Sequence, residues 1–292
     1  MVSGENEMIA NYLADILIPM SVFLIMFTVG TGMSLPKLKK SQGYFRTIVV
    51  CVSTQLVLLP LATIVLIQVL KPDPILTVGL LVLSLCPSGA LSNFYVYLGR
   101  GNVELSIFLT IIGSMVYVIL FPVVATIAFS FLPDLENGLT FPAGAIAVQL
   151  TFLVLFPAAL GVGVKHYRAT KVDDVRPFLD RTSNVLLVLM ILLSTWVGRE
   201  FLTSSLFEIV KYSVLYAMIS LGIGILFARL VRPVHRSTFA IECAVRNLPI
   251  ALMIVQHFID VSQVTGLFVG YFLVHAPIAL LFSGYMRCKI PS

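Results

Sequence analysis

Nine long apolar runs follow one another along the chain, separated by short polar segments. Each run matches or exceeds the about 20 residues that a helix needs to cross the hydrocarbon core of a membrane. The runs show no strict alternation of apolar and polar positions and are too long for the strands of a membrane barrel, so each is predicted to be a helix. The predicted spans cover residues about 9–33, 46–70, 75–98, 104–132, 141–164, 178–198, 205–228, 237–259 and 262–286.

The composition agrees with this pattern and excludes several classes of protein. The 292 residues are 59% hydrophobic and 11% charged, with a mean hydropathy of +1.01. A soluble domain has about 45–50% apolar and about a quarter charged residues, and no single water-soluble core could hide this excess of apolar surface. We therefore expect an all-α polytopic protein in a lipid bilayer, and neither a soluble enzyme nor a protein that binds nucleic acid.

The basic residues predict the orientation of the spans. Of nineteen Lys and Arg residues, fifteen follow odd-numbered spans and three lie on the opposite side. Basic loops remain in the cytoplasm, so we expect the N-terminus outside and the C-terminus in the cytoplasm, as an odd number of spans requires. The remaining basic residue, Arg246, lies inside the eighth span.

Arg246 shares this span with Glu242, the one acidic residue that lies far from a span end. A charge at membrane depth costs at least a few kcal/mol and is by default a sign of function. The alternative is an ion pair within one helix, Glu before Arg at i,i+4, which only neutralises itself. We favour a functional role, because a pair of hydrophobic residues would stabilise the span at lower cost.

Two spans contain helix breakers near their middle. The third span holds CPSGALSN at residues 86–93, and the eighth holds ECAVRNLP at residues 242–249. Backbone groups that leave a helix at this depth are tolerated only where they are buried in protein or line a wet cavity. Two such breaks at corresponding positions of two halves are the best indication in a sequence of a transport site.

The breaks also indicate how the chain is organised. A first repeat at about 9–132 and a second at about 178–286 each carry a break in their third span, and a linking span at about 141–164 has no counterpart. The two repeats enter the membrane from opposite sides, so they are inverted, which is typical of secondary transporters that work by alternating access. We predict a single transporter domain over residues 1–292.

Oxygen-bearing side chains gather near the breaks. Ser92 and Asn93 end the first break, while Ser106 and Thr110 share one face of the next helix because they are four residues apart. With Glu242 they form a set of oxygen ligands with one negative charge, which suits a monovalent cation better than calcium. Taken singly, such Ser and Thr residues more often form hydrogen bonds between helices.

The sequence leaves the roles of two further polar residues undecided and favours an anionic substrate. Gln55 lies in mid-span, where it either belongs to a site or forms a hydrogen bond between helices. His275 is a proton relay, a substrate contact or a packing residue. The N-termini of half-helices carry partial positive charge and favour an anionic substrate. Arg246 strengthens this preference if its side chain faces the cavity.

The motifs at the first break resemble those of the bile acid:sodium symporter family. The run CPSGALSN at 86–93, continued by YLGRGN at 97–102, is similar to the family signature CPGGxxSN…YLARGN. The resemblance covers nearly the whole chain, including Glu242 and Asn247. It implies a nine-helix form of a fold in which a core domain, with two crossing broken helices, moves against a panel domain.

The resemblance also implies two sodium sites and a substrate cavity. The first sodium site corresponds to Ser92, Asn93, Ser106, Thr110 and Glu242. The second corresponds to Gln55, Glu242 and the backbone around Cys243 and Val245. Asn247 and His275 fall where the family lines its substrate cavity.

Arg246 departs from the family pattern, in which a Gln at this position completes the second sodium site. A guanidinium supplies no oxygen ligand and is effectively always charged, so it would repel a cation beside it. We predict a symporter that moves a small organic anion with sodium as the coupling ion, and with a reduced sodium count because Arg246 replaces a second-site ligand.

Other functions fit the sequence less well. A sodium-independent or proton-coupled transporter of organic anions is the first alternative. A membrane enzyme is the second, but the spans hold no paired aspartate motif, no cluster of zinc ligands and no Ser/His/Asp arrangement. No organic cofactor and no obligatory protein partner are expected.

Overall fold

The computed structural model describes residues 11–33, 41–131, 143–255 and 261–289, and helix is the only regular structure in these ranges. Seven helices are long and apolar enough to cross a membrane, and two shorter apolar helices accompany them, Asp15–Thr31 and Pro74–Leu85. The seven are Phe45–Leu70, Val103–Ser130, Gly144–Tyr167, Ala169–Val197, Leu206–Leu230, Pro233–Val255 and Val264–Cys288. Two predicted spans are not among them: 9–33, whose first residues lie outside the described part, and 75–98, which the first break divides.

The described chain folds into fourteen α-helices in addition to short 3-10 and π-helical turns. The first seven helices are α2 (Ile18–Thr31), α4 (Phe45–Ser53), α5 (Leu59–Leu70), α6 (Pro74–Leu85), α7 (Leu91–Leu98), α8 (Val103–Ser130) and α10 (Ala143–Leu150). The others are α11 (Phe156–Tyr167), α12 (Ala169–Val197), α13 (Arg199–Ser204), α14 (Leu206–Phe227), α15 (Arg236–Ala244), α16 (Leu248–Val255) and α17 (Val261–Lys289). The 3-10 turns are Ser41–Tyr44, Ala228–Leu230 and Pro233–His235.

Three spans contain a π-helical turn, and each turn is followed by a proline at the start of the next helix. The turns are Leu13–Leu17, Thr54–Leu58 and Thr151–Leu155, followed by Pro19, Pro60 and Pro157. A proline lacks the N–H that would bond to the carbonyl four residues earlier, and its ring crowds that carbonyl. The wider turn accommodates both effects without ending the span. The second of these turns carries Gln55.

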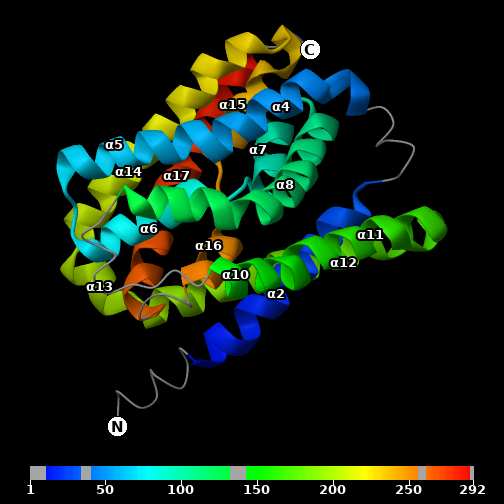
Figure 1. Ribbon diagram of the computed structural model, residues 1–292. Coiled ribbons are helices and arrows are strands. Elements are labelled where there is room, and N and C mark those ends of the chain that lie inside the picture. Colours follow the sequence, from blue (N-terminus) through cyan, green and yellow to red (C-terminus); the bar gives the residue numbers. More distant parts are fainter. Residues whose placement is uncertain (1–10, 34–40, 132–142, 256–260, 290–292) are drawn as a thin grey trace.

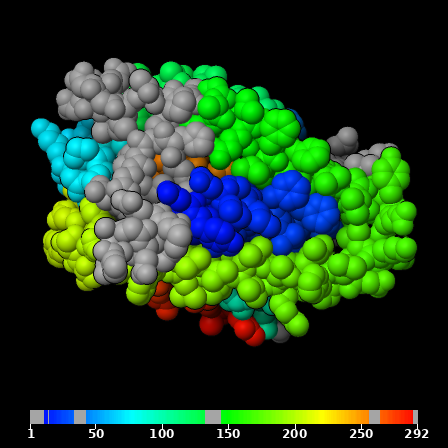
Figure 2. Space-filling model, turned by 90° about the horizontal axis from the view of Figure 1, so that it is seen from below, coloured from blue at the N-terminus to red at the C-terminus, as the bar shows by residue number. Residues whose placement is uncertain are grey.

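The helices form two groups (Figure 1). Helices α2, α10, α11 and α12 lie together on one side, and α4–α8 lie with α14, α15 and α17 on the other. Seen from below, α2 runs between α11 and α12 along the outer face (Figure 2), and it packs against both. Helix α16 lies where the groups meet, because it contacts α2 as well as α6 and α17.

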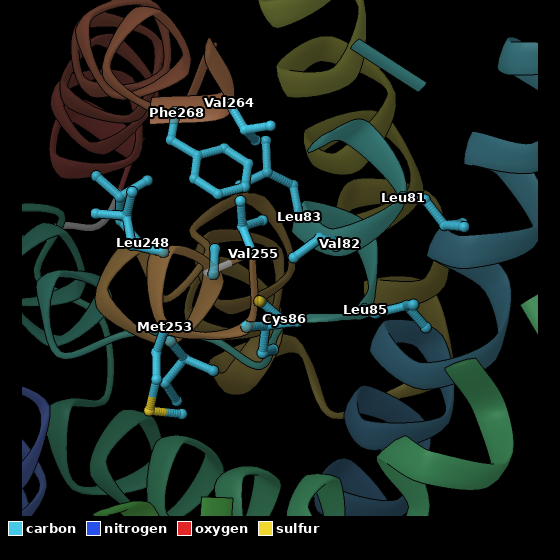
Figure 3. Packing of buried hydrophobic residues seen from close by; sticks show 14 of the residues in the cluster. Leu81, Val82, Leu83, Leu85, Cys86, Leu248, Met253, Val255, Val264 and Phe268 are labelled. Atoms are coloured by element: carbon cyan, nitrogen blue, oxygen red, sulfur yellow. The ribbon is translucent and has the colours of Figure 1, made fainter. Parts of the chain in front are cut away.

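The main apolar cluster surrounds α16, and Figure 3 shows part of it. All eight residues of α16 are buried, as is typical of a helix that is apolar on every side. Val255 of this helix lies close to Val264 and Phe268 of α17 and to Leu83 of α6. Helix α16 is therefore enclosed by protein on all sides.

Glycines bring α2 and α11 close together. A Cβ atom added to Gly30 would collide with the backbone carbonyl of Ala158, and one added to Gly161 would collide with that of Phe27. Small residues allow membrane helices to approach until their backbones touch. The two helices are therefore joined by backbone contact, which leaves little freedom for one to slide on the other.

Replacing Gly161 by Val is expected to lower the stability of the protein in detergent, because the new side chain must displace the backbone of α2. Overpacking of this kind costs about 1–3 kcal/mol. Gly163→Val is the matched control, since a Cβ atom at Gly163 would meet no atom within 4 Å. Thermal unfolding followed by circular dichroism should show a lower melting temperature for the first variant only. Equal losses in both variants would contradict the close contact.

Candidate functional site

The two predicted helix breaks are present and lie against each other. The first covers residues 86–90, between α6 and α7, and the second covers residues 245–247, between α15 and α16. The backbone N–H of Asn247 donates to the carbonyl of Pro87 at 2.9 Å. Each break thus supplies the other with a partner for a backbone group that its own helix does not satisfy.

Gly89 marks the closest approach of the two breaks. A Cβ atom at this position would lie 3.1 Å from Cα of Asn247 and 3.3 Å from the carbonyl oxygen of Arg246. Both distances are tighter than ordinary van der Waals contact, so a side chain at residue 89 would push the breaks apart. This close contact explains sterically why a glycine occupies this position of the CPSGALSN run.

Glu242 is fully buried in α15, and three hydroxyl groups donate to its carboxylate. Oγ of Ser92 lies 2.6 Å from Oε1, Oγ of Ser106 donates to the same oxygen, and Oγ1 of Thr110 lies 3.4 Å from Oε2. Ser92 comes from the first turn of α7, and the other two come from one face of α8. Hydrogen bonds to an ionised acceptor are strong, so the cluster ties three helices together.

Asn93 is the remaining predicted ligand of the first sodium site. It follows Ser92 in α7, and its side-chain oxygen Oδ1 is buried with no hydrogen-bond partner. The structure therefore brings four of the five predicted residues into direct contact and leaves the fifth with a free acceptor. Buried acceptors in proteins usually have a partner, which can be a water molecule or an ion.

Gln55 connects the π-helical turn between α4 and α5 to the first break and to α15. Its Oε1 accepts the backbone N–H of Ser88 at 3.2 Å, and its Nε2 lies 3.4 Å from the carbonyl oxygen of Glu242. Nε2 also donates to Sγ of Cys51 at 3.2 Å. The interhelical hydrogen bond considered for this residue is thus present, and a role as an ion ligand stays a prediction.

Arg246 is buried but forms no direct ion pair with Glu242 among the described residues. Its Nη1 donates to the carbonyl of Cys86 at 2.9 Å, and its Nη2 donates to the carbonyl of Cys243. The i,i+4 ion pair, which was the alternative to a functional role, is absent because α15 ends at Ala244 and the two charged residues do not share one helix. The guanidinium lies instead at the C-terminal ends of α6 and α15, where the helix dipole is negative.

A cavity adjoins the breaks and lies between the two groups of helices. Its enclosed volume is about 30 Å³, enough for about two water molecules. Its walls are formed by both breaks, by the starts of α7 and α16, and by parts of α2, α12 and α17. The lining residues are Gly89, Ala90, Leu91, Arg246, Asn247, Leu248, Pro249, Ile25, Leu187, Tyr271, Phe272 and His275.

Several polar atoms of these walls are buried without a well-formed hydrogen bond. They are Nε of Arg246, Nδ2 of Asn247 and both ring nitrogens of His275. An unpaired buried donor costs about 1–3 kcal/mol. The first two atoms can only donate, so the cavity suits a molecule that carries acceptor oxygens.

Tyr271 completes this wall, although the sequence analysis did not single it out. Its ring stacks on that of His275 with centroids 4.9 Å apart and an angle of 12° between the planes. Its hydroxyl donates to the carbonyl of Ala244 at 3.1 Å, which links α17 to the end of α15. The sequence does contain a signal for this contact, because Tyr271 and His275 are four residues apart and so lie on one face of the helix.

The chain is similar to several sodium-dependent transporters over most of its length. The sodium-dependent organic anion transporter of Bos taurus is 26% identical over 271 residues, which cover 90% of this chain and 69% of that protein. An uncharacterized sodium-dependent transporter of Bacillus subtilis is 26% identical over 244 residues, covering 82% and 74%. The ileal sodium/bile acid cotransporter of Oryctolagus cuniculus is 24% identical over 306 residues, covering 98% and 84%.

A family model matches the chain as well. The match covers residues 19–205, which include the first break, Gln55 and the hydroxyl groups of α8, while the second break follows the matched range. More than half of the chain is matched, and the chain therefore belongs to the sodium bile acid symporter family.

Proposed function

We propose that this protein is a secondary symporter that moves a small organic anion across a membrane together with sodium. The observation that carries the proposal is the buried Glu242 carboxylate, which three hydroxyl groups surround beside two helix breaks. Membership of a sodium symporter family and seven long apolar helices support it. The names of the relatives, which mention sodium with organic anions or bile acids, agree with it.

The proposed architecture has nine spans in two inverted repeats. The seven long helices supply seven spans, α2 with its preceding π-helical turn supplies another, and α6 with α7 forms the broken third span. We assign α2, α10, α11 and α12 to the panel and the other helices to the core. The N-terminus is proposed to lie outside and the C-terminus in the cytoplasm, because the basic residues predict this orientation.

The first sodium site is proposed at Glu242, Ser92, Asn93, Ser106 and Thr110. All five supply oxygen atoms, which are the ligands of hard cations, and the single carboxylate balances one monovalent charge. The oxygen of Asn93, the residue after Ser92, supports this assignment because it is a buried acceptor without a donor. Sodium is a transported ion here, so the site needs to bind it only reversibly.

The substrate is proposed to occupy the cavity beside the breaks, with its negative group toward Arg246 and Asn247. The N-termini of α7 and α16 line this cavity, and helix N-termini favour anions. The apolar side chains of Ile25, Leu187 and Phe272 would contact the rest of the substrate. Nothing in the walls requires a steroid, so a small carboxylate or sulfonate is the proposed class of substrate.

At the second site we propose that the guanidinium of Arg246 takes the place of a sodium ion. It already bonds to the carbonyl of Cys243, which the family resemblance assigns to that site, and to the carbonyl of Cys86. Two unit charges about 4 Å apart repel by about 4 kcal/mol at an effective dielectric constant of 20. That energy corresponds to about a thousandfold loss of affinity, so one sodium ion is expected per cycle.

Loss of a hydroxyl ligand should weaken sodium binding. Ser106→Ala and Thr110→Val are each expected to reduce sodium affinity by about ten- to a hundredfold, because a contact to a charged group contributes about 1.5–3 kcal/mol. Affinity can be measured from thermal stabilisation by sodium at constant ionic strength, with potassium as the replacement.

Ser114→Ala is the matched control for these variants. Ser114 is buried on the same helix, but its hydroxyl donates to the carbonyl of Thr110 at 2.7 Å. We expect its sodium affinity to equal that of the wild type. If Ser114→Ala and Ser106→Ala behave alike, the assignment of the first site is wrong.

Replacing Arg246 by Gln should restore a second sodium ion, because the substitution removes the positive charge and supplies an amide oxygen. In reconstituted vesicles, parallel isotope fluxes of sodium and substrate should give one sodium ion per substrate for the wild type and two for Arg246→Gln. With a monovalent anion, wild-type uptake is then electroneutral and insensitive to an imposed membrane potential, whereas uptake by the variant responds to it.

Other outcomes of this experiment identify the alternatives. A ratio of two in both proteins would rule out the replacement of sodium by Arg246. Loss of substrate affinity in Arg246→Gln with unchanged sodium dependence would assign the guanidinium to substrate binding. Wild-type uptake that follows a proton gradient, or that needs no sodium, would favour the proton-coupled or sodium-independent transporter.

A further inference from the structure

Two cysteine side chains that the proposed transport cycle does not use face each other beside the second break. Cys51 lies in α4 and Cys243 in the last turn of α15, and their Sγ atoms are 4.0 Å apart. Both residues are fully buried. Helices far apart in the sequence thus bring two sulfur atoms together inside the protein.

We propose that the side chains of Cys51 and Cys243 form a two-coordinate binding site for a soft, thiophilic metal ion of the Cu⁺, Ag⁺ or Hg²⁺ class. Half of the 4.0 Å separation is close to a metal–sulfur bond, which is about 2.3 Å for zinc. A small outward movement of each sulfur would therefore admit one ion between them. Both thiols release their protons as the two metal–sulfur bonds form.

The surroundings select against harder ions. The pair lies in an apolar cluster with Ile48, Leu105, Leu109 and Phe239, and no group of three or more His, Cys, Asp or Glu side chains in the described part of the chain could hold a metal ion. Zinc in structural sites takes four ligands, and Na⁺ and Ca²⁺ take oxygen. Two thiolates without further donors suit a soft ion with low coordination number.

Occupation of this site would affect the proposed second ion site. Sγ of Cys51 accepts a hydrogen bond from Nε2 of Gln55, whose amide also contacts the backbone of Ser88 and Glu242. A metal ion would engage the same sulfur and compete with this hydrogen bond. We therefore expect the bound ion to inhibit uptake.

The test uses Ag⁺ with the purified full-length chain in a chloride-free buffer, after reduction and removal of the reductant. Cys288 is exposed, so Cys288→Ser provides the background. Native mass spectrometry should show one retained Ag⁺ per molecule in Cys288→Ser. Adding Cys51→Ser or Cys243→Ser should each weaken binding at least tenfold, whereas adding Cys86→Ser should not, because Cys86 is also buried but outside the pair.

The opposite results would overturn the proposal. Undiminished Ag⁺ binding in the Cys51→Ser protein would show that the sulfurs act singly or not at all. Elution at the native volume in size-exclusion chromatography checks folding, and Ala variants replace any Ser variant that fails. Ag⁺ should also inhibit uptake by Cys288→Ser but spare the additional Cys51→Ser variant. Binding without inhibition would leave the site in place but refute its link to Gln55.

Discussion

Backbone polar groups at membrane depth must find partners inside the protein, and this constraint governs the arrangement around the breaks. The hydrogen bond from Asn247 to the carbonyl of Pro87 and the two bonds that Arg246 donates to Cys86 and Cys243 meet this need. Glycine at residue 89 allows the segments to approach without a shift of their backbones. The breaks set where each half-helix begins or ends, so the contact between them helps to place α16, α7 and α15 around Glu242.

Much of this arrangement could be predicted from the sequence because the relevant signals are local. Helix breakers inside apolar runs predicted both breaks, and the spacing of Ser106 and Thr110 predicted that both would face one partner. Their contact with Glu242 is confirmed. Polar groups inside a membrane must find partners within the protein. The depth and spacing of a few polar residues therefore indicate which helix faces meet.

Other features could not be predicted because they depend on where a helix ends in three dimensions. The i,i+4 spacing of Glu242 and Arg246 suggested a direct ion pair, but the end of α15 at Ala244 turns the arginine toward two carbonyl groups. The approach of Cys51 to Cys243 joins segments with no shared pattern. The stacking of Tyr271 on His275 was only partly predictable from the sequence. The spacing of four residues places both rings on one helix face, but aromatic residues are common in such spans and do not by themselves indicate a site.

The position of Arg246 has a thermodynamic consequence for the proposed cycle. A cation that is part of the chain does not dissociate, so its site is filled at any external sodium concentration and draws nothing from the sodium gradient. For a tenfold gradient and no membrane potential, one coupled ion supports about a tenfold accumulation of substrate and two support about a hundredfold, since each tenfold gradient corresponds to about 1.4 kcal/mol. A transporter with this fixed positive charge therefore accumulates its substrate less strongly, but it needs only one sodium ion and can work at lower sodium concentrations.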